Sequence, residues 1–252
     1  AAPSARRGVE VGAGGRGFPI VLGRILVDAS RPTVVFYGHY DVVGAGGEGW
    51  LSPPFCLTVS DGYARGRGVT DNKGPIVAML ATVRELLRAR EPPPFNFAFV
   101  FDGEEEVGSV GFDAAMAGER AWLGGDAGVA CVLISNTYWL SDERPCLVYG
   151  LRGVAHLDVR VRGAHRSLHS GVHGGAVHEP TIELAALLAT LVDTATGRVL
   201  VRGFEDAVRP LVDAEAALYD SVDFDARKYA QRIGAAVRLS LIHISEPTRL
   251  GM

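Results

Sequence analysis

The stretch VVFYGHYDVV, residues 34–43, constrains this chain more than any other part of the sequence. An apolar run leads into Gly38, and His39 and Asp41 follow with one residue between them. Such a run is typical of a strand buried on both faces, and open α/β sheets bind ligands at the carboxyl ends of these strands. Imidazole is a common zinc ligand, and a nearby carboxylate commonly holds its other ring nitrogen. The alternative is a His and an Asp that only cap the turn after the strand.

Composition limits the classes of protein to which the chain can belong. Its 252 residues suffice for one large domain or two smaller ones, and 48% of them are hydrophobic. The formal net charge of −4 gives no electrostatic reason to expect binding to nucleic acid or to an anionic membrane. No apolar run approaches the ~18 residues of a membrane span. The three cysteines are far apart and form no CxxC pair, which indicates a reducing compartment and hence the cytoplasm.

Two glycine-rich segments match the pattern GxGxxG, GAGGRG at residues 12–17 and GAGGEG at residues 44–49. The first runs into the strand-like residues 18–27, and the second into a segment with two consecutive prolines. Because a phosphate-binding loop needs a strand before it and a helix after it, both segments are interpreted as loops.

Buried strands and helices alternate along the first part of the chain. A hairpin is predicted to turn at Asp61-Gly62, and a helix is predicted from Pro75, which places Asp71 just before the helix N-terminus. The apolar run 95–101 predicts another buried strand. Further along, the patterns predict a helix over 112–120 and a strand over 129–134.

The pattern changes after Arg144. Residues 146–153 and 154–163 predict a pair of antiparallel strands, and a helix is predicted over 179–191. The predicted fold class is therefore α/β, with a mostly parallel sheet and flanking helices over residues 1–147. Residues 148–238 are predicted to form part of an α+β domain.

Several polar residues fall at the ends of the predicted strands or in the loops after them. They are His39, Asp71, Glu105, Glu106 and Asn136. Parallel α/β topology brings such ends together at one edge of the sheet, and one imidazole with several carboxylates suits Zn²⁺ or Mn²⁺. The adjacent residues Glu105 and Glu106 could take two different roles, in which one binds metal and the other acts as general base.

These motifs resemble those of the dinuclear zinc metallopeptidases that include carnosinases, cytosolic non-specific dipeptidases, aminoacylases and carboxypeptidase G. GHYDV matches G-H-x-D-V of that family, GRGVTDNKGP matches G-R-G-x-x-D-x-K-G, and DGEEEVGS matches (E/D)-G-x-E-E-x-G-S. The dipeptidase branch is the most similar, through Trp50 with Pro54-Phe55, the DNKGP ending, ISNTYWL and LHSGVHGG followed by HEP. The resemblance covers roughly residues 20–235.

The resemblance implies two divalent metal ions, Zn²⁺ or Mn²⁺, and a role for each matching residue. His39 would bind one metal and Asp41 would orient its ring. Asp71 would bridge both metals, Glu106 would be a ligand, and Glu105 would be the general base.

The resemblance also implies a lid and dimerisation domain over residues 148–238. His169 in this domain would reach the active site of the partner subunit in a homodimer and polarise the scissile carbonyl. The alternative is an ordinary loop histidine.

Two features depart from the family. Asn136 stands in Ile134-Ser135-Asn136 where the dipeptidase branch has ISD, so this ligand would offer a neutral carbonyl oxygen and bind the second metal weakly. The last family ligand is a His far downstream. His243 is the only His beyond residue 178, and it is rejected as a ligand because it lies in an unusual tail.

This tail contains LSLIHISEPTR, residues 239–249, which matches the translation of a transposase adapter used in sequencing. Residues 239–252 are therefore interpreted as an artefact that follows a truncated gene, whereas the alternative is a genuine β-like tail.

The expected function of the parent protein is metal-dependent hydrolysis of amide bonds in dipeptides or small peptides, by a metal-activated water with Glu105 as base. One alternative is an N-acyl amino acid deacylase with the same centre. Another is a metal-poor binding homologue without catalysis, which Asn136 would favour. The chain as it stands is expected to be inactive or nearly so.

Overall fold

The computed structural model describes residues 4–9, 17–47, 49–137, 139, 144–151, 153–220 and 222–235. The chain divides into two compact units, residues 1–137 and residues 138–252. The adapter-like tail and His243 lie outside the described residues, as does most of the first glycine-rich segment. The described residues of the second glycine-rich segment form no helix.

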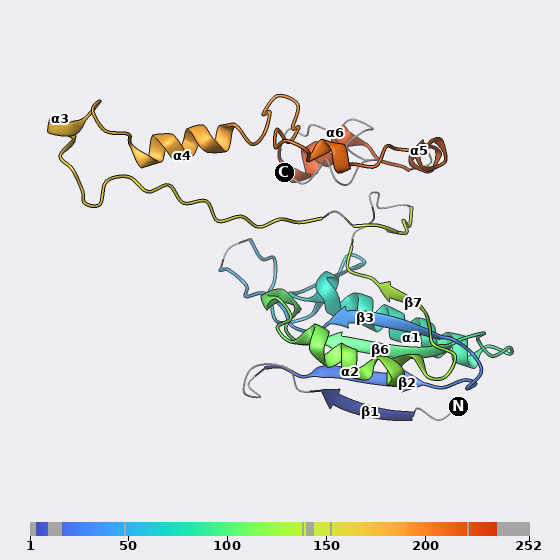
Figure 1. The fold of residues 1–252 in the computed structure, drawn as a ribbon. Coiled ribbons are helices and arrows are strands. Elements are labelled where there is room, and N and C mark those ends of the chain that lie inside the picture. Colours follow the sequence, from blue (N-terminus) through green and yellow to red (C-terminus); the bar gives the residue numbers. More distant parts are fainter. Residues whose placement is uncertain are drawn as a thin grey trace. The chain divides into compact units, whose positions relative to one another are not determined.

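The first unit is built on a mixed sheet with the strand order β1-β2-β6-β3-β7 (Figure 1). These strands are β1 (Ser4–Val9), β2 (Ile20–Ile25), β3 (Thr33–His39), β6 (Asn96–Asp102) and β7 (Val129–Ile134). β3 is parallel to β6 and β7, and β2 is antiparallel to both β1 and β6. Only β2 therefore runs against the other strands of this described sheet, which confirms the prediction of a mostly parallel α/β sheet.

Two helices cover opposite faces of the sheet, α1 (Gly74–Arg88) and α2 (Phe112–Gly124). The core on the α1 face contains Val34, Phe36, Ile76, Met79, Val83, Phe97 and Phe99. The core on the α2 face contains Ile20, Leu22, Val35, Ala98, Val100 and Leu123. Since successive side chains of a strand point to opposite faces, Val34 and Val35 enter different cores. This confirms that β3 is buried on both faces.

The chain between β3 and β6 turns back on itself before it enters α1. β4 (Thr58–Ser60) and β5 (Tyr63–Arg65) form the predicted hairpin, and Asp61 and Gly62 at its turn both have positive φ. A short turn, η1 (Val69–Lys73), in which the backbone of Asp71 is not helical, then leads directly into α1. Asp71 lies inside η1, before the predicted helix, and its peptide bond to Asn72 is cis.

Gly38 lies on β3 immediately before His39, and its surroundings leave no room for a side chain. A Cβ at Gly38 would lie 2.7 Å from both Asn72 Oδ1 and Ile76 Cγ1. We expect Gly38→Ala to lower the free energy of unfolding by about 1–3 kcal/mol, because it overpacks a filled region. Gly44→Ala is the matched control, since a Cβ there would have no atom within 4 Å.

Urea unfolding of the two glycine variants and the parent chain measures this difference. For Gly44→Ala we expect a change of no more than about 0.5 kcal/mol. Equal stabilities of the two variants would contradict the close packing at Gly38.

The described part of the second unit contains helices and turns but no strand pair longer than a single bridge between Val192 and Val199. Its elements are α3 (Ser170–His173), α4 (Pro180–Ala189), η3 (Glu205–Ala207), α5 (Asp213–Asp220) and α6 (Ala226–Ile233). The carboxylate of Glu179 accepts hydrogen bonds from the first backbone N–H groups of α4, which confirms the predicted helix start. No helix among the described residues has both the length and the apolar character needed to cross a membrane.

The antiparallel strand pair predicted over residues 146–163 is wrong for the described residues of that stretch. The chain there is extended without ladder hydrogen bonds (Figure 1). Most of its apolar side chains are exposed, with Leu147 at 94% and Leu157 at 79%. A strand requires a neighbour that accepts its N–H groups and donates to its carbonyl groups, and apolar alternation alone does not supply one.

Candidate metal centre

Three neighbouring strands end at the same edge of the sheet, and the candidate site lies there. His39 at the end of β3 pairs with Asp102 of β6, and Tyr37 of β3 pairs with Ile134 of β7. Since these strands are parallel, the segments that follow them meet. Those segments and η1 bring together the predicted residues His39, Asp41, Asp71, Glu105, Glu106 and Asn136.

The His39 ring is fully buried between two carboxylates. Its Nε2 atom lies 2.8 Å from Asp71 Oδ1, and its Nδ1 atom lies 3.2 Å from Asp41 Oδ1. Burial alone would lower the pKa of His39. The hydrogen bond to Asp71 and the negative charges of Glu105, Asp71 and Asp41 outweigh burial, so the pKa of His39 is raised. Such an environment favours a positive charge at the ring, from a proton or from a cation.

Asp41 connects His39 to the turn that carries the two glutamates. Asp41 Oδ2 accepts a hydrogen bond of 3.0 Å from the backbone N–H of Glu106. Asp41 Oδ1 and His39 Nδ1 are close but do not reach hydrogen-bond geometry, and among the described residues neither atom has another hydrogen-bond partner. Metal binding through His39 Nε2 would place the ring proton on Nδ1, where Asp41 can accept it. These two buried atoms therefore fit a metal centre.

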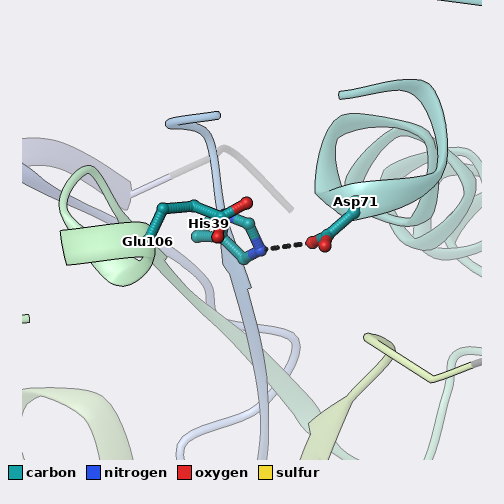
Figure 2. A group of neighbouring side chains, drawn as sticks. All are labelled: His39, Asp71 and Glu106. Atoms are coloured by element: carbon teal, nitrogen blue, oxygen red, sulfur yellow. Dashed lines mark hydrogen bonds and ion pairs between the residues drawn. The ribbon is translucent and has the colours of Figure 1, made fainter. Parts of the chain in front are cut away.

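His39, Asp71 and Glu106 converge from three separate elements (Figure 2). His39 ends β3, Asp71 lies in η1, and Glu106 lies in the short turn η2 (Glu105–Val107). Each residue offers one ligand atom, and the three atoms lie within 4.8 Å of one another. One imidazole nitrogen and two carboxylate oxygens form a donor set that suits Zn²⁺ or Mn²⁺.

Glu105 lies beside this cluster, with its Oε2 atom 3.9 Å from His39 Nε2. Burial raises the pKa of the Glu105 carboxyl. The positive charge of His39 opposes this change, and the negative charges of Glu106, Asp71 and Asp41 add to it, so the pKa is raised overall. A carboxyl group with a raised pKa can both accept and return a proton near neutral pH.

Asp102 holds the turn that carries the two glutamates, and the sequence patterns did not reveal this role. It is the buried last residue of β6. Its carboxylate accepts hydrogen bonds from Ser109 Oγ at 2.6 Å and from the backbone N–H of Glu104 at 3.0 Å. The available signal was an aspartate at the end of an otherwise apolar strand, where a carboxylate needs hydrogen-bond donors.

Asn72 is a second buried residue whose role the sequence patterns did not reveal. Its Oδ1 atom accepts a hydrogen bond of 3.2 Å from the backbone N–H of His39. Its Nδ2 atom donates to Ser135 O at 2.7 Å and to Asn136 Oδ1 at 2.8 Å. Asn72 thus joins the ends of β3 and β7, and its only sequence signal is its place next to Asp71.

His169 belongs to the second unit, and its role in catalysis stays a prediction. Its exposed side chain precedes α3, and its Nδ1 atom accepts a hydrogen bond of 3.0 Å from the backbone N–H of Gly171. This contact accounts for the local conformation of His169 without any substrate.

The chain belongs to Peptidase family M20/M25/M40, whose sequence profile matches residues 35–249. It is 40% identical over 223 residues to Cys-Gly metallodipeptidase dug1 of Schizosaccharomyces pombe, which covers 88% of this chain and 46% of the relative. The structure of human carnosine dipeptidase 1 is similar with a TM-score of 0.67 and 33% identity, over 96% of this chain and 51% of that chain. An M20 family metallo-carboxypeptidase from Sulfolobus solfataricus gives a TM-score of 0.73 and 28% identity, over 97% of this chain and 53% of that one.

These comparisons confirm the family resemblance and the fold class. The chain is homologous to metallodipeptidases and carries a candidate metal site. It spans about half the length of the relatives that it matches.

Proposed function

We propose that the whole protein to which this chain belongs hydrolyses the amide bond of dipeptides or similarly small peptides in a metal-dependent reaction. The observation that carries this proposal is the convergence of His39, Asp71 and Glu106 with Glu105 beside them. The names of the relatives, a Cys-Gly metallodipeptidase and a carnosine dipeptidase, support dipeptides as the substrate class.

In this proposal His39 Nε2 and one carboxylate oxygen each of Asp71 and Glu106 hold a divalent ion, Zn²⁺ or Mn²⁺. When bound, the ion supplies a Lewis acid that polarises the scissile carbonyl and lowers the pKa of a water molecule. Asp41 keeps the His39 ring and the Glu106 backbone in place. The family resemblance implies a second ion in this centre.

Glu105 moves the proton. Its Oε2 atom accepts a proton from the attacking water and then donates it to the nitrogen of the leaving amine. The raised pKa of Glu105 suits this exchange, because a carboxyl that is too acidic would not return the proton at neutral pH.

The domain roles belong to the same proposal. Residues 1–147 would be the N-terminal part of the catalytic domain, and residues 148–238 part of a lid through which the whole protein forms a homodimer. His169 would then polarise the scissile carbonyl in the active site of the partner subunit. These roles rest on the family resemblance.

Hydrolysis assays on the whole protein, loaded with Zn²⁺ or Mn²⁺, test the proposed function. We expect Cys-Gly and β-Ala-His to be hydrolysed, N-acetyl amino acids to be hydrolysed far more slowly, and chelation to abolish turnover until metal is restored. The 252-residue chain alone should show little turnover. Activity of the metal-loaded protein on N-acetyl amino acids alone would favour a deacylase, and activity on neither panel would contradict both functions.

A further inference from the structure

The orientation of the Asn72 side chain follows from two backbone groups that each have one hydrogen-bonding role. The backbone N–H of His39 can only donate, so the Asn72 atom 3.2 Å away must be the oxygen Oδ1. The backbone carbonyl of Ser135 can only accept, so the Asn72 atom 2.7 Å away must be the nitrogen Nδ2. Both constraints select the same orientation of the amide.

This orientation determines the orientation of Asn136 in turn. Asn72 Nδ2 also lies 2.8 Å from the side chain of Asn136, so the Asn136 atom at this contact must be an acceptor, Oδ1. The other end of the Asn136 amide, Nδ2, then faces the metal centre and lies 3.4 Å from His39 Nε2. The side chain of Asn72 is fully buried, and so it holds this arrangement away from bulk water.

An amide nitrogen in this position cannot bind a cation. The NH₂ group of asparagine is a hydrogen-bond donor, and its hydrogens would face the ion. Rotating the Asn136 amide would bring its oxygen to the ion. It would also place the NH₂ group of Asn136 against the NH₂ group of the buried Asn72, and neither group can accept a hydrogen bond. A buried donor without an acceptor is costly, so the hydrogen bonds oppose this rotation.

We propose that Asn136 is not a metal ligand, and that this edge of the sheet holds a single divalent ion through His39, Asp71 and Glu106. This inference rests on the metal centre of the proposed function. It replaces the sequence-based prediction that the Asn136 carbonyl oxygen binds metal. An aspartate at position 136 would meet both demands, since one oxygen could accept from Asn72 Nδ2 while the other faced the ion with a negative charge.

Zinc titration of the 252-residue chain against a chromophoric chelator tests this inference, with metal analysis of each dialysed sample. A zinc ion of the parent chain is assigned to this site when the His39→Ala variant no longer binds it. We expect one such ion per chain, and we expect Asn136→Ala to change the zinc affinity by less than about tenfold, since no ligand is lost. We expect Asn136→Asp to bind zinc at least about tenfold more tightly, since it gains a charged oxygen ligand.

Circular dichroism checks that each variant is folded. Asn136→Asp keeps an acceptor for Asn72, and where Asn136→Ala unfolds the number of site-specific ions in the parent chain still decides the question. A loss of about tenfold or more in zinc affinity in folded Asn136→Ala would overturn the inference, as would two site-specific ions in the parent chain or no gain in Asn136→Asp. Absence of site-specific zinc from the parent chain would overturn the metal centre itself. Failure of peptide hydrolysis with zinc bound as expected would count against the proposed function alone.

Discussion

Replacing Glu105 with glutamine is expected to lower kcat of the whole protein on a dipeptide by about 10²–10⁴-fold, the usual contribution of a general base. Glutamine has nearly the same size as glutamate, but its amide cannot take up a proton from water and return it. Because Glu105 is not among the three cluster residues that offer ligand atoms, the metal content of Glu105→Gln should equal that of the parent protein. Steady-state kinetics and metal analysis on the same samples measure both quantities.

Glu104→Gln is the matched control, because it removes the same charge one position earlier. The Glu104 side chain accepts a hydrogen bond of 3.2 Å from the backbone N–H of Phe18, which the oxygen of glutamine can also accept. We expect this variant to stay within about threefold of the parent kcat, as is usual where no proton-transfer group is removed. Equal losses in the two variants would show a general charge effect, and they would remove Glu105 from the proposed mechanism.

Replacing His39 with alanine is expected to weaken zinc binding to the 252-residue chain by at least about 100-fold, since loss of a residue that only holds a metal ligand in place already costs about 10–100-fold. His39 supplies the nitrogen of the three-residue cluster. Its loss leaves Asp71 and Glu106 to bind the ion without the imidazole between the carboxylates. Competition with a chromophoric chelator measures the affinity, at a temperature where circular dichroism shows the variant to be folded.

His173→Ala is the matched control for this substitution. His173 is the exposed last residue of α3 in the second unit, and it makes no side-chain contact with the cluster among the described hydrogen bonds and ion pairs. Its zinc affinity should stay within about threefold of the parent chain. If His39→Ala retained zinc as well as His173→Ala does, the metal centre would have to lie elsewhere.

Local patterns in the sequence were sufficient to predict the fold of the first unit. β3 and β6 are continuous apolar runs, and the helix that begins near Pro75 has apolar residues at helical spacing. Each pattern lies within a single strand or helix, and it indicates which face of that element is buried. They also placed His39, Asp71 and Glu106 correctly at one sheet edge, since parallel strands must end together.

Local patterns were insufficient wherever a residue acts through a partner far along the chain. The apolar residues of 146–163 predicted a strand pair, yet no neighbouring strand is present among the described residues to form it. Asn72 likewise showed no signal for its hydrogen bond to Ser135, which lies 63 residues further along the chain.

Asn72 and Asn136 show most clearly the difference between what the sequence determines and what the tertiary structure decides. The sequence by itself determined that an amide replaces a carboxylate at position 136, and that three strand ends would carry the candidate ligands. Only the tertiary structure decided which way the Asn136 amide points, because Asn72 takes its own orientation from His39 and Ser135, which are 33 and 63 residues away. Hydrogen bonds between buried groups are directional, and their direction depends on partners that no local pattern identifies.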